Sequence, residues 1–158
     1  MLSIIVDVKN QQLTLYSQNE PIKHYVVSTA KNGLGELSGS YCTPRGKHVI
    51  RAKIGAGVPM GGVFVRRRFT QEIYTSELAA LFPARDWILT RILWLSGLEP
   101  GVNRLGKVDT MRRFIYIHGT PDTEALGQPV SHGCIRMSNE DVLDLFDRVA
   151  PGCPVTIR

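Results

Sequence analysis

The sequence reads Phe114-Ile115-Tyr116-Ile117-His118-Gly119-Thr120 and, after a mostly polar loop, Ser131-His132-Gly133-Cys134-Ile135-Arg136. The first segment is rich in aromatic and β-branched residues and is expected to be a core strand that ends at His118. The loop after it can fold back and bring Cys134 beside His118, which lies sixteen positions earlier. The stretch therefore predicts a sheet with a histidine and a cysteine together at the end of one strand.

A histidine beside a cysteine suits nucleophilic catalysis. A thiol attacks a carbonyl well only as the thiolate, and a free thiol with a pKa of about 8.5 is mostly protonated at neutral pH. A neighbouring imidazole can take the proton. Two histidines, His118 and His132, flank Cys134. We therefore expect Cys134 to be a nucleophile, with an imidazole as its base.

The residues next to Cys134 are candidates for the remaining parts of an acyl-transfer site. Such a site needs N–H groups aimed at the oxyanion of the transition state. Gly133 permits a sharp turn, and the N–H groups of Gly133 and Cys134 are the natural donors. In an extended segment Arg136 lies on the same face as Cys134 and could grip a carboxylate. Ser131, Gly133 and Arg136 are thus the candidate substrate and oxyanion contacts.

Each of these residues also has a structural interpretation. A free cysteine is commonly buried and inert, and His132 or His118 alone could be an ordinary hydrogen-bonded histidine. A zinc site built from His118, His132 and Cys134 has suitable donor atoms, but His-x-Cys is tight and a fourth ligand is missing. No metal and no cofactor is expected. Cys42 and Cys153 are expected to be structural, since three cysteines form no disulfide framework or paired zinc motif.

The rest of the chain reads mainly as short strands separated by turns. The strand candidates are residues 4–8, 13–16, 22–28, 47–54 and 87–94, with 154–157 as a last strand. Thr43-Pro44-Arg45-Gly46 is expected to be a turn. One helix is predicted after Ser138, whose side chain can cap it, and Pro151-Gly152 ends it. Its apolar residues recur at helical spacing: Val142, Leu145, Phe146 and Val149.

The motif resembles the L,D-transpeptidase catalytic domain, also called the YkuD family, whose signature is a His, a gap and then [Ser/Thr]-His-Gly-Cys. The likeness extends to residues 5–16, to Thr43-Pro44-Arg45-Gly46 and to the strand 113–118, and so covers nearly the whole chain. It implies a mainly β fold, a single YkuD-like domain over residues 1–158. In that fold a β-sandwich or mixed sheet carries one or two short helices, including one after the cysteine. The less familiar residues 58–108 are expected to build part of the substrate cleft.

The resemblance also implies roles for the site residues. Cys134 would be the nucleophile and His118 the general base, oriented by the backbone carbonyl of Gly119, while His132 lines the pocket. The implied substrate is a peptidoglycan stem peptide or muropeptide, cut before its terminal D-Ala. We favour water as the acceptor, which gives an L,D-carboxypeptidase of peptidoglycan recycling. The alternative is an amine acceptor, which gives a transpeptidase that forms cross-links or exchanges D-amino acids in the cell wall. Carbapenem β-lactams are implied as acylating inhibitors. A non-catalytic peptidoglycan-binding module is the rival from another class.

Composition narrows the class of protein further. The chain has 158 residues with 43% hydrophobic and 21% charged residues, which is ordinary for a globular domain. A formal charge of +5 without a recognisable module gives no reason to expect nucleic-acid binding. The run Arg66-Arg67-Arg68 favours a solvated strand or loop face, with attraction of an anionic substrate as the alternative.

The sequence also bears on location. No window is long and apolar enough to span a membrane, and Leu2 to Val6 reads as a strand and not as a signal peptide. We therefore expect a cytoplasmic protein if residue 1 is the natural start, and a periplasmic or envelope protein if the chain is a piece of a longer one.

Overall fold

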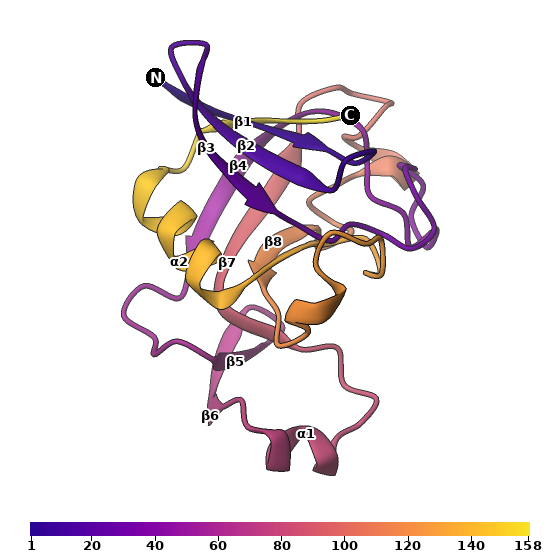
Figure 1. The fold of residues 1–158 in the computed structure, drawn as a ribbon. Helices are drawn as coiled ribbons and strands as arrows, with labels where there is room; N and C mark the ends of the chain where they lie inside the picture. Colours follow the sequence, from indigo (N-terminus) through magenta and orange to yellow (C-terminus); the bar gives the residue numbers. More distant parts are fainter.

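The computed structural model describes residues 1–158 as one mixed sheet of ten strands with two α-helices and two short 3₁₀ helices (Figure 1). The strands are β1 (Leu2–Asp7), β2 (Gln12–Ser17), β3 (Glu20–Val26), β4 (Gly46–Ile54), β5 (Gly62–Val65), β6 (Arg68–Ile73), β7 (Ile88–Gly97), β8 (Tyr116–Gly119), β9 (Ile135–Met137) and β10 (Pro154–Ile157). The helices are α1 (Ser76–Leu81), η1 (Gly106–Val108), η2 (Thr123–Ala125) and α2 (Asn139–Arg148). The predicted mainly β fold with a helix after Cys134 is confirmed.

The order of the strands puts the two ends of the chain in the middle of the sheet. They run β3-β2-β1-β10-β4-β7-β5-β6, with β8 beside β7 and β9 beside β8. β1 and β10 pair in parallel, so the first and last strands lie side by side at the top of Figure 1. The strands expected from the sequence are present, with ends displaced by up to three residues, and the hairpin of the first two is β1–β2.

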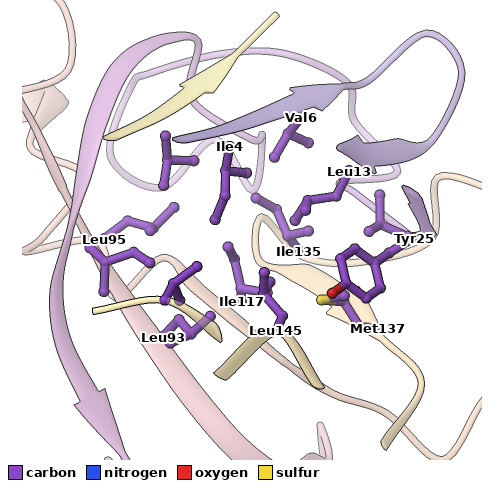
Figure 2. Close-up of a cluster of buried hydrophobic side chains, with 14 of the residues drawn as sticks. Ile4, Val6, Leu13, Tyr25, Leu93, Leu95, Ile117, Ile135, Met137 and Leu145 are labelled. Carbon is purple, nitrogen blue, oxygen red and sulfur yellow. The ribbon is translucent and has the colours of Figure 1, made fainter. Parts of the chain in front are cut away.

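A core of 20 buried residues lies between the sheet and α2 (Figure 2). Its labelled members come from β1, β2, β3, β7, β8, β9 and α2: Ile4, Val6, Leu13, Tyr25, Leu93, Leu95, Ile117, Ile135, Met137 and Leu145. Burying one Leu or Ile side chain contributes about 1.5–3 kcal/mol. Because a slip by one residue would turn this set outward, the core fixes the register of β8 and β9.

Helix α2 forms as its sequence predicts. Ser138 is the N-cap, and its Oγ accepts a hydrogen bond of 3.1 Å from the Asp141 N–H. Val142, Leu145 and Phe146 are buried on one face. The helix ends at Arg148, just before Pro151-Gly152. Neither α-helix has the length and apolar character that crossing a bilayer would require.

The turn predicted at Thr43-Pro44-Arg45-Gly46 is wrong: Thr43 lies in a β-bridge, Pro44 and Arg45 form no turn, and Gly46 begins β4. Thr43 forms an isolated β-bridge with Leu34. The Thr43 hydroxyl donates to the Gly133 carbonyl at 2.9 Å and accepts from the Ala30 N–H at 3.0 Å. These long-range contacts outweigh the local turn preference of a Pro-x-Gly sequence, and they tie the segment to the loop that carries Cys134.

The part of the chain between β4 and β7 contains a hairpin and a helix that sequence patterns did not resolve. β5 and β6 pair antiparallel, with Val65 opposite Arg68, so Arg66-Arg67 forms the two-residue turn. Both turn residues have positive φ, 50° for Arg66 and 65° for Arg67. With α1, this hairpin projects at the bottom of Figure 1.

Candidate active site

The parallel pair β8–β9 places the predicted site residues on one face of the sheet. Ile117 lies opposite Ile135, and His118 lies opposite Arg136. Side chains alternate along a strand, so the two isoleucines point into the core and His118 and Arg136 point to the opposite face. On that face a cavity of about 490 Å³ opens, lined by His118, Cys134 and Arg136 among others.

His118 is held as one tautomer. It is 1% exposed, and its Nδ1 lies 2.8 Å from the Gly119 carbonyl oxygen. A carbonyl can only accept, so Nδ1 carries the hydrogen and Nε2 keeps the lone pair. Burial lowers the pKa of the His118 imidazole below its usual range. The ring is therefore neutral at pH 7, in the form that can accept a proton.

Gly119 has no room for a side chain. A Cβ there would lie 2.7 Å from the Leu89 carbonyl oxygen and would overlap the Asn139 side chain. The Thr90 hydroxyl, donating to Asn139 Oδ1 at 2.6 Å, holds that side chain in place. The close packing fixes the carbonyl that orients His118.

We expect Gly119→Ala to lower the free energy of unfolding by about 1–3 kcal/mol, because overpacking forces backbone or side chains to shift. The shift moves the Gly119 carbonyl away from Nδ1, so turnover falls as well. Urea denaturation and steady-state rates measure the two effects. Gly101→Ala is the control for turnover: its φ of +80° makes alanine cost stability there as well, but the added Cβ meets nothing within 4 Å. Its turnover should therefore stay close to that of the wild type, and an equal loss of turnover in both variants would contradict the packing argument.

The Cys134 thiol rests against the backbone of the neighbouring strand. Its Sγ accepts from the Tyr116 N–H at 3.3 Å and donates to the Phe114 carbonyl at 3.4 Å. Cys134 is partly exposed to the cavity, yet the atoms packed around the sulfur desolvate a thiolate. That desolvation raises the pKa of Cys134 to about 12, against the opposing effect of the Tyr116 N–H. Cys134 and His118 line the same cavity, but the resting thiol is neutral and its hydrogen bonds go to the backbone.

Ser131 and Gly133 shape the loop that carries Cys134. The Ser131 hydroxyl donates to the Cys134 carbonyl at 2.6 Å and accepts from the Gly133 N–H at 3.2 Å. Gly133 has a φ of +129°, which favours glycine. The Gly133 N–H is thus engaged within the loop and is not a free oxyanion donor, which corrects the expectation for it. The backbone hydrogen bonds of the chain leave the Cys134 N–H unpaired.

Asp86, which no sequence pattern identified, sits between two expected site residues. Its carboxylate is 3.1 Å from Arg136 Nη2 and 3.7 Å from His132 Nδ1. Arg136 is therefore paired within the protein, so the expectation that it grips a substrate carboxylate does not fit the geometry. His132 also lines the cavity, and its ring centroid lies 6.2 Å from that of Tyr41 in an edge-to-face arrangement.

The cavity is strongly cationic. Four arginines line it, Arg66, Arg67, Arg113 and Arg136, against the one carboxylate of Asp86. Arg66 and Arg67 belong to the basic run for which the sequence favoured a solvated strand or loop face. Their position in the cavity fits the other interpretation better, which is attraction of an anionic substrate. The expectation that residues 58–108 contribute to the cleft fits the same observation.

The zinc alternative finds no site in this fold. No three His, Cys, Asp or Glu side chains come together as potential metal ligands. The Nδ1 of His118 is also committed to the Gly119 carbonyl. The arrangement can instead transfer a proton from the Cys134 thiol to the neutral His118 imidazole, beside a cationic cavity.

Comparison with known proteins identifies similar sequences. The family described as the L,D-transpeptidase catalytic domain matches residues 2–157. The Probable L,D-transpeptidase YcfS of Escherichia coli K12 is 26% identical over 155 residues, covering 98% of this chain and 43% of that protein. The Probable L,D-transpeptidase YbiS of the same strain is 46% identical over 43 residues, covering 27% of this chain and 14% of YbiS. The chain thus spans less than half the length of these relatives.

Solved structures share the fold. L,D-transpeptidase 3 from Mycobacterium tuberculosis, in complex with a faropenem-derived adduct, has a TM-score of 0.61 and 17% identity. The match covers 99% of this chain and 60% of that one. At this identity the likeness concerns the fold alone.

Proposed function

The chain belongs to the L,D-transpeptidase catalytic domain family, and from that premise we propose that it cleaves the bond before the terminal D-Ala of peptidoglycan tetrapeptide stems through a thioester on Cys134. The observation that carries the proposal is the opening of Cys134 and a neutral, tautomer-fixed His118 into one cationic cavity.

Acylation begins with a proton transfer. His118 Nε2 takes the proton of Cys134 as the thiol turns from the Phe114 carbonyl toward the substrate. The sulfur adds to the carbonyl carbon of the third stem residue. The C–N bond to D-Ala then breaks, and the imidazolium gives its proton to the departing amine. The acceptor resolves the thioester and restores the thiol.

The oxyanion of this step needs donors that are not already bonded. The unpaired Cys134 N–H is the first candidate. The Tyr116 N–H, which already contacts the sulfur at 3.3 Å, is a second donor within reach once the sulfur has become part of a thioester. This pair replaces the Gly133 and Cys134 pair that the sequence suggested.

Charge supports an anionic stem peptide as the substrate and water as the acceptor. The excess of arginines in the cavity attracts the carboxylates of a stem peptide. The same excess disfavours an incoming ammonium group relative to neutral water. We therefore favour L,D-carboxypeptidase action on soluble muropeptides in recycling, with a cytoplasmic location as part of that proposal. Transpeptidation in the envelope is the second candidate, which family membership favours.

Mass spectrometry of a disaccharide-tetrapeptide incubated with the protein distinguishes the two. Conversion to the tripeptide, unchanged by an added D-amino acid, supports the carboxypeptidase. Exchange of D-Ala for the added D-amino acid, or dimer formation, supports the transpeptidase. No conversion, with Cys134 unmodified, contradicts both. Cell fractionation tests the location separately.

A carbapenem is expected to acylate Cys134 and neither of the other thiols. Cys42 is half-buried with its Sγ 3.6 Å from two backbone carbonyls, and burial raises the pKa of Cys153 to about 11. Intact-mass measurement with imipenem should show one adduct on the wild type and on Cys42→Ser/Cys153→Ala, and none on Cys134→Ala. The double variant keeps its turnover within about twofold, since it touches no reacting group. An adduct on Cys134→Ala would contradict the assignment, and absence from all three would favour a binding module.

A further inference from the structure

The catalytic cavity holds four arginines, and their contacts differ. Arg136 is paired with Asp86 at 3.1 Å. Arg113 donates to the Gly35 and Cys42 carbonyls, at 3.2 and 2.6 Å, so its guanidinium is used in holding the loop. Neither is free to bind a new carboxylate without losing a partner.

Arg67 is held differently. Its guanidinium carbon lies 5.0 Å from the Trp94 ring centroid and 4.5 Å from that of Phe114. Its Nη1 donates to the Tyr116 hydroxyl at 2.9 Å, and it has no carboxylate partner. A guanidinium has five N–H donors, so most of them stay unused. The aromatic contacts thus fix the position of the Arg67 guanidinium but leave most of its N–H groups without acceptors.

Arg67 is also tied to the nucleophile. The residue whose hydroxyl it binds, Tyr116, donates its own backbone N–H to Cys134 Sγ at 3.3 Å. Both arginines of the hairpin turn occupy the left-handed region, which is strained for a residue other than glycine. Asn-Gly would make such a turn with less strain. Strain of this kind, at a position that brings a guanidinium over the cavity, points to a functional use.

We propose that Arg67 forms a carboxylate-binding subsite of the cavity and selects stem peptides that present a carboxylate near the scissile bond. The inference rests on the proposed function, because it concerns the substrate of that reaction. Two carboxylates have the right chemistry: the C-terminal one of the departing D-Ala and the side-chain one of a diacidic third residue. Bidentate binding to a guanidinium suits either.

The test compares wild type, Arg67→Lys and Arg67→Gln on three tetrapeptides: unmodified, amidated at the third-residue side chain, and amidated at the C-terminus. We expect Arg67→Gln to raise KM for the unmodified peptide about 10- to 100-fold, the range for a hydrogen bond to a charged group, with a much smaller change in kcat. Arg67→Lys keeps the charge but loses the planar guanidinium, so its KM should lie between those of the wild type and Arg67→Gln. One of the two amidated peptides lacks the carboxylate that Arg67 binds. For that peptide the wild-type KM should be higher than for the unmodified peptide, and Arg67→Gln should not change it further.

Arg51→Gln is the matched control. Arg51 also stacks on Trp94, at 5.6 Å, but it lines a different cavity, so its loss should leave KM unchanged. Binding of the unmodified peptide to Cys134→Ala, with and without Arg67→Gln, gives a readout that needs no turnover. Equal KM changes for all three peptides, or an unchanged KM, would overturn the subsite. Binding to Cys134→Ala that depends on Arg67, without turnover of any peptide by the wild type, would keep the subsite and reject the proposed reaction.

Discussion

Cys134→Ala reduces release of the terminal D-Ala from a disaccharide-tetrapeptide by at least about 10⁴-fold, because no other group at the site can form the acyl-enzyme. The remaining cavity still binds the peptide, since the arginines and His118 stay in place. The fold should also be kept. The thiol lies at the edge of the cavity and contributes only two long hydrogen bonds, of 3.3 and 3.4 Å.

The measurement is the rate of tripeptide formation by mass spectrometry, with thermal unfolding as a check on folding. Cys134→Ser is a useful second variant, because serine keeps the shape of the side chain while its hydroxyl is a weaker nucleophile. Turnover by Cys134→Ala within tenfold of the wild type, with the fold intact, would contradict the mechanism.

His118→Ala should slow acylation of Cys134 at pH 7 by about 10²- to 10⁴-fold, the usual contribution of a positioned general base. The raised pKa of Cys134, to about 12, makes this dependence strong, because almost no thiolate forms unaided at neutral pH. Burial keeps the His118 pKa low, so the wild-type base is already neutral near pH 7.

The two pKa shifts give the variants different pH profiles. In the wild type the rate of Cys134 alkylation by iodoacetamide should fall only in acid, where His118 becomes protonated. In His118→Ala the rate should rise about tenfold per pH unit through the alkaline range, since it follows the thiolate fraction below the thiol pKa. A plateau near neutral pH in His118→Ala would mean that another base serves Cys134 or that the thiol is not desolvated.

Local sequence signals predicted the elements whose stability is local or depends on simple periodicity. The α2 helix follows from the Ser138 cap and the apolar spacing of Val142, Leu145 and Phe146, and the structure has all of these contacts. The core strands β7 and β8 follow from their apolar composition. Thr43–Gly46 failed because its conformation is decided by partners far along the chain, such as the Gly133 carbonyl.

In the site, too, local sequence signals predicted some features, and contacts between distant segments determine the others. The placement of His118 and Cys134 at one cavity could be predicted, because the motif keeps them close in the chain. Asp86 could not, since it comes from the segment between β4 and β7 and reaches the cavity only through tertiary packing. For Arg67 the sequence offered only the alternative that the run Arg66-Arg67-Arg68 attracts an anionic substrate. The sequence therefore left Arg136 without its Asp86 partner, and it gave no sign that the Ser131 hydroxyl accepts the Gly133 N–H.

The most direct test of the central claim is intact-protein mass spectrometry of the wild type, quenched in acid shortly after mixing with disaccharide-tetrapeptide, followed by peptide mapping. A thioester intermediate should appear as an added mass equal to the substrate minus D-Ala, located on Cys134. Release of D-Ala with no such adduct under any quench time, or an adduct on another residue, would contradict it.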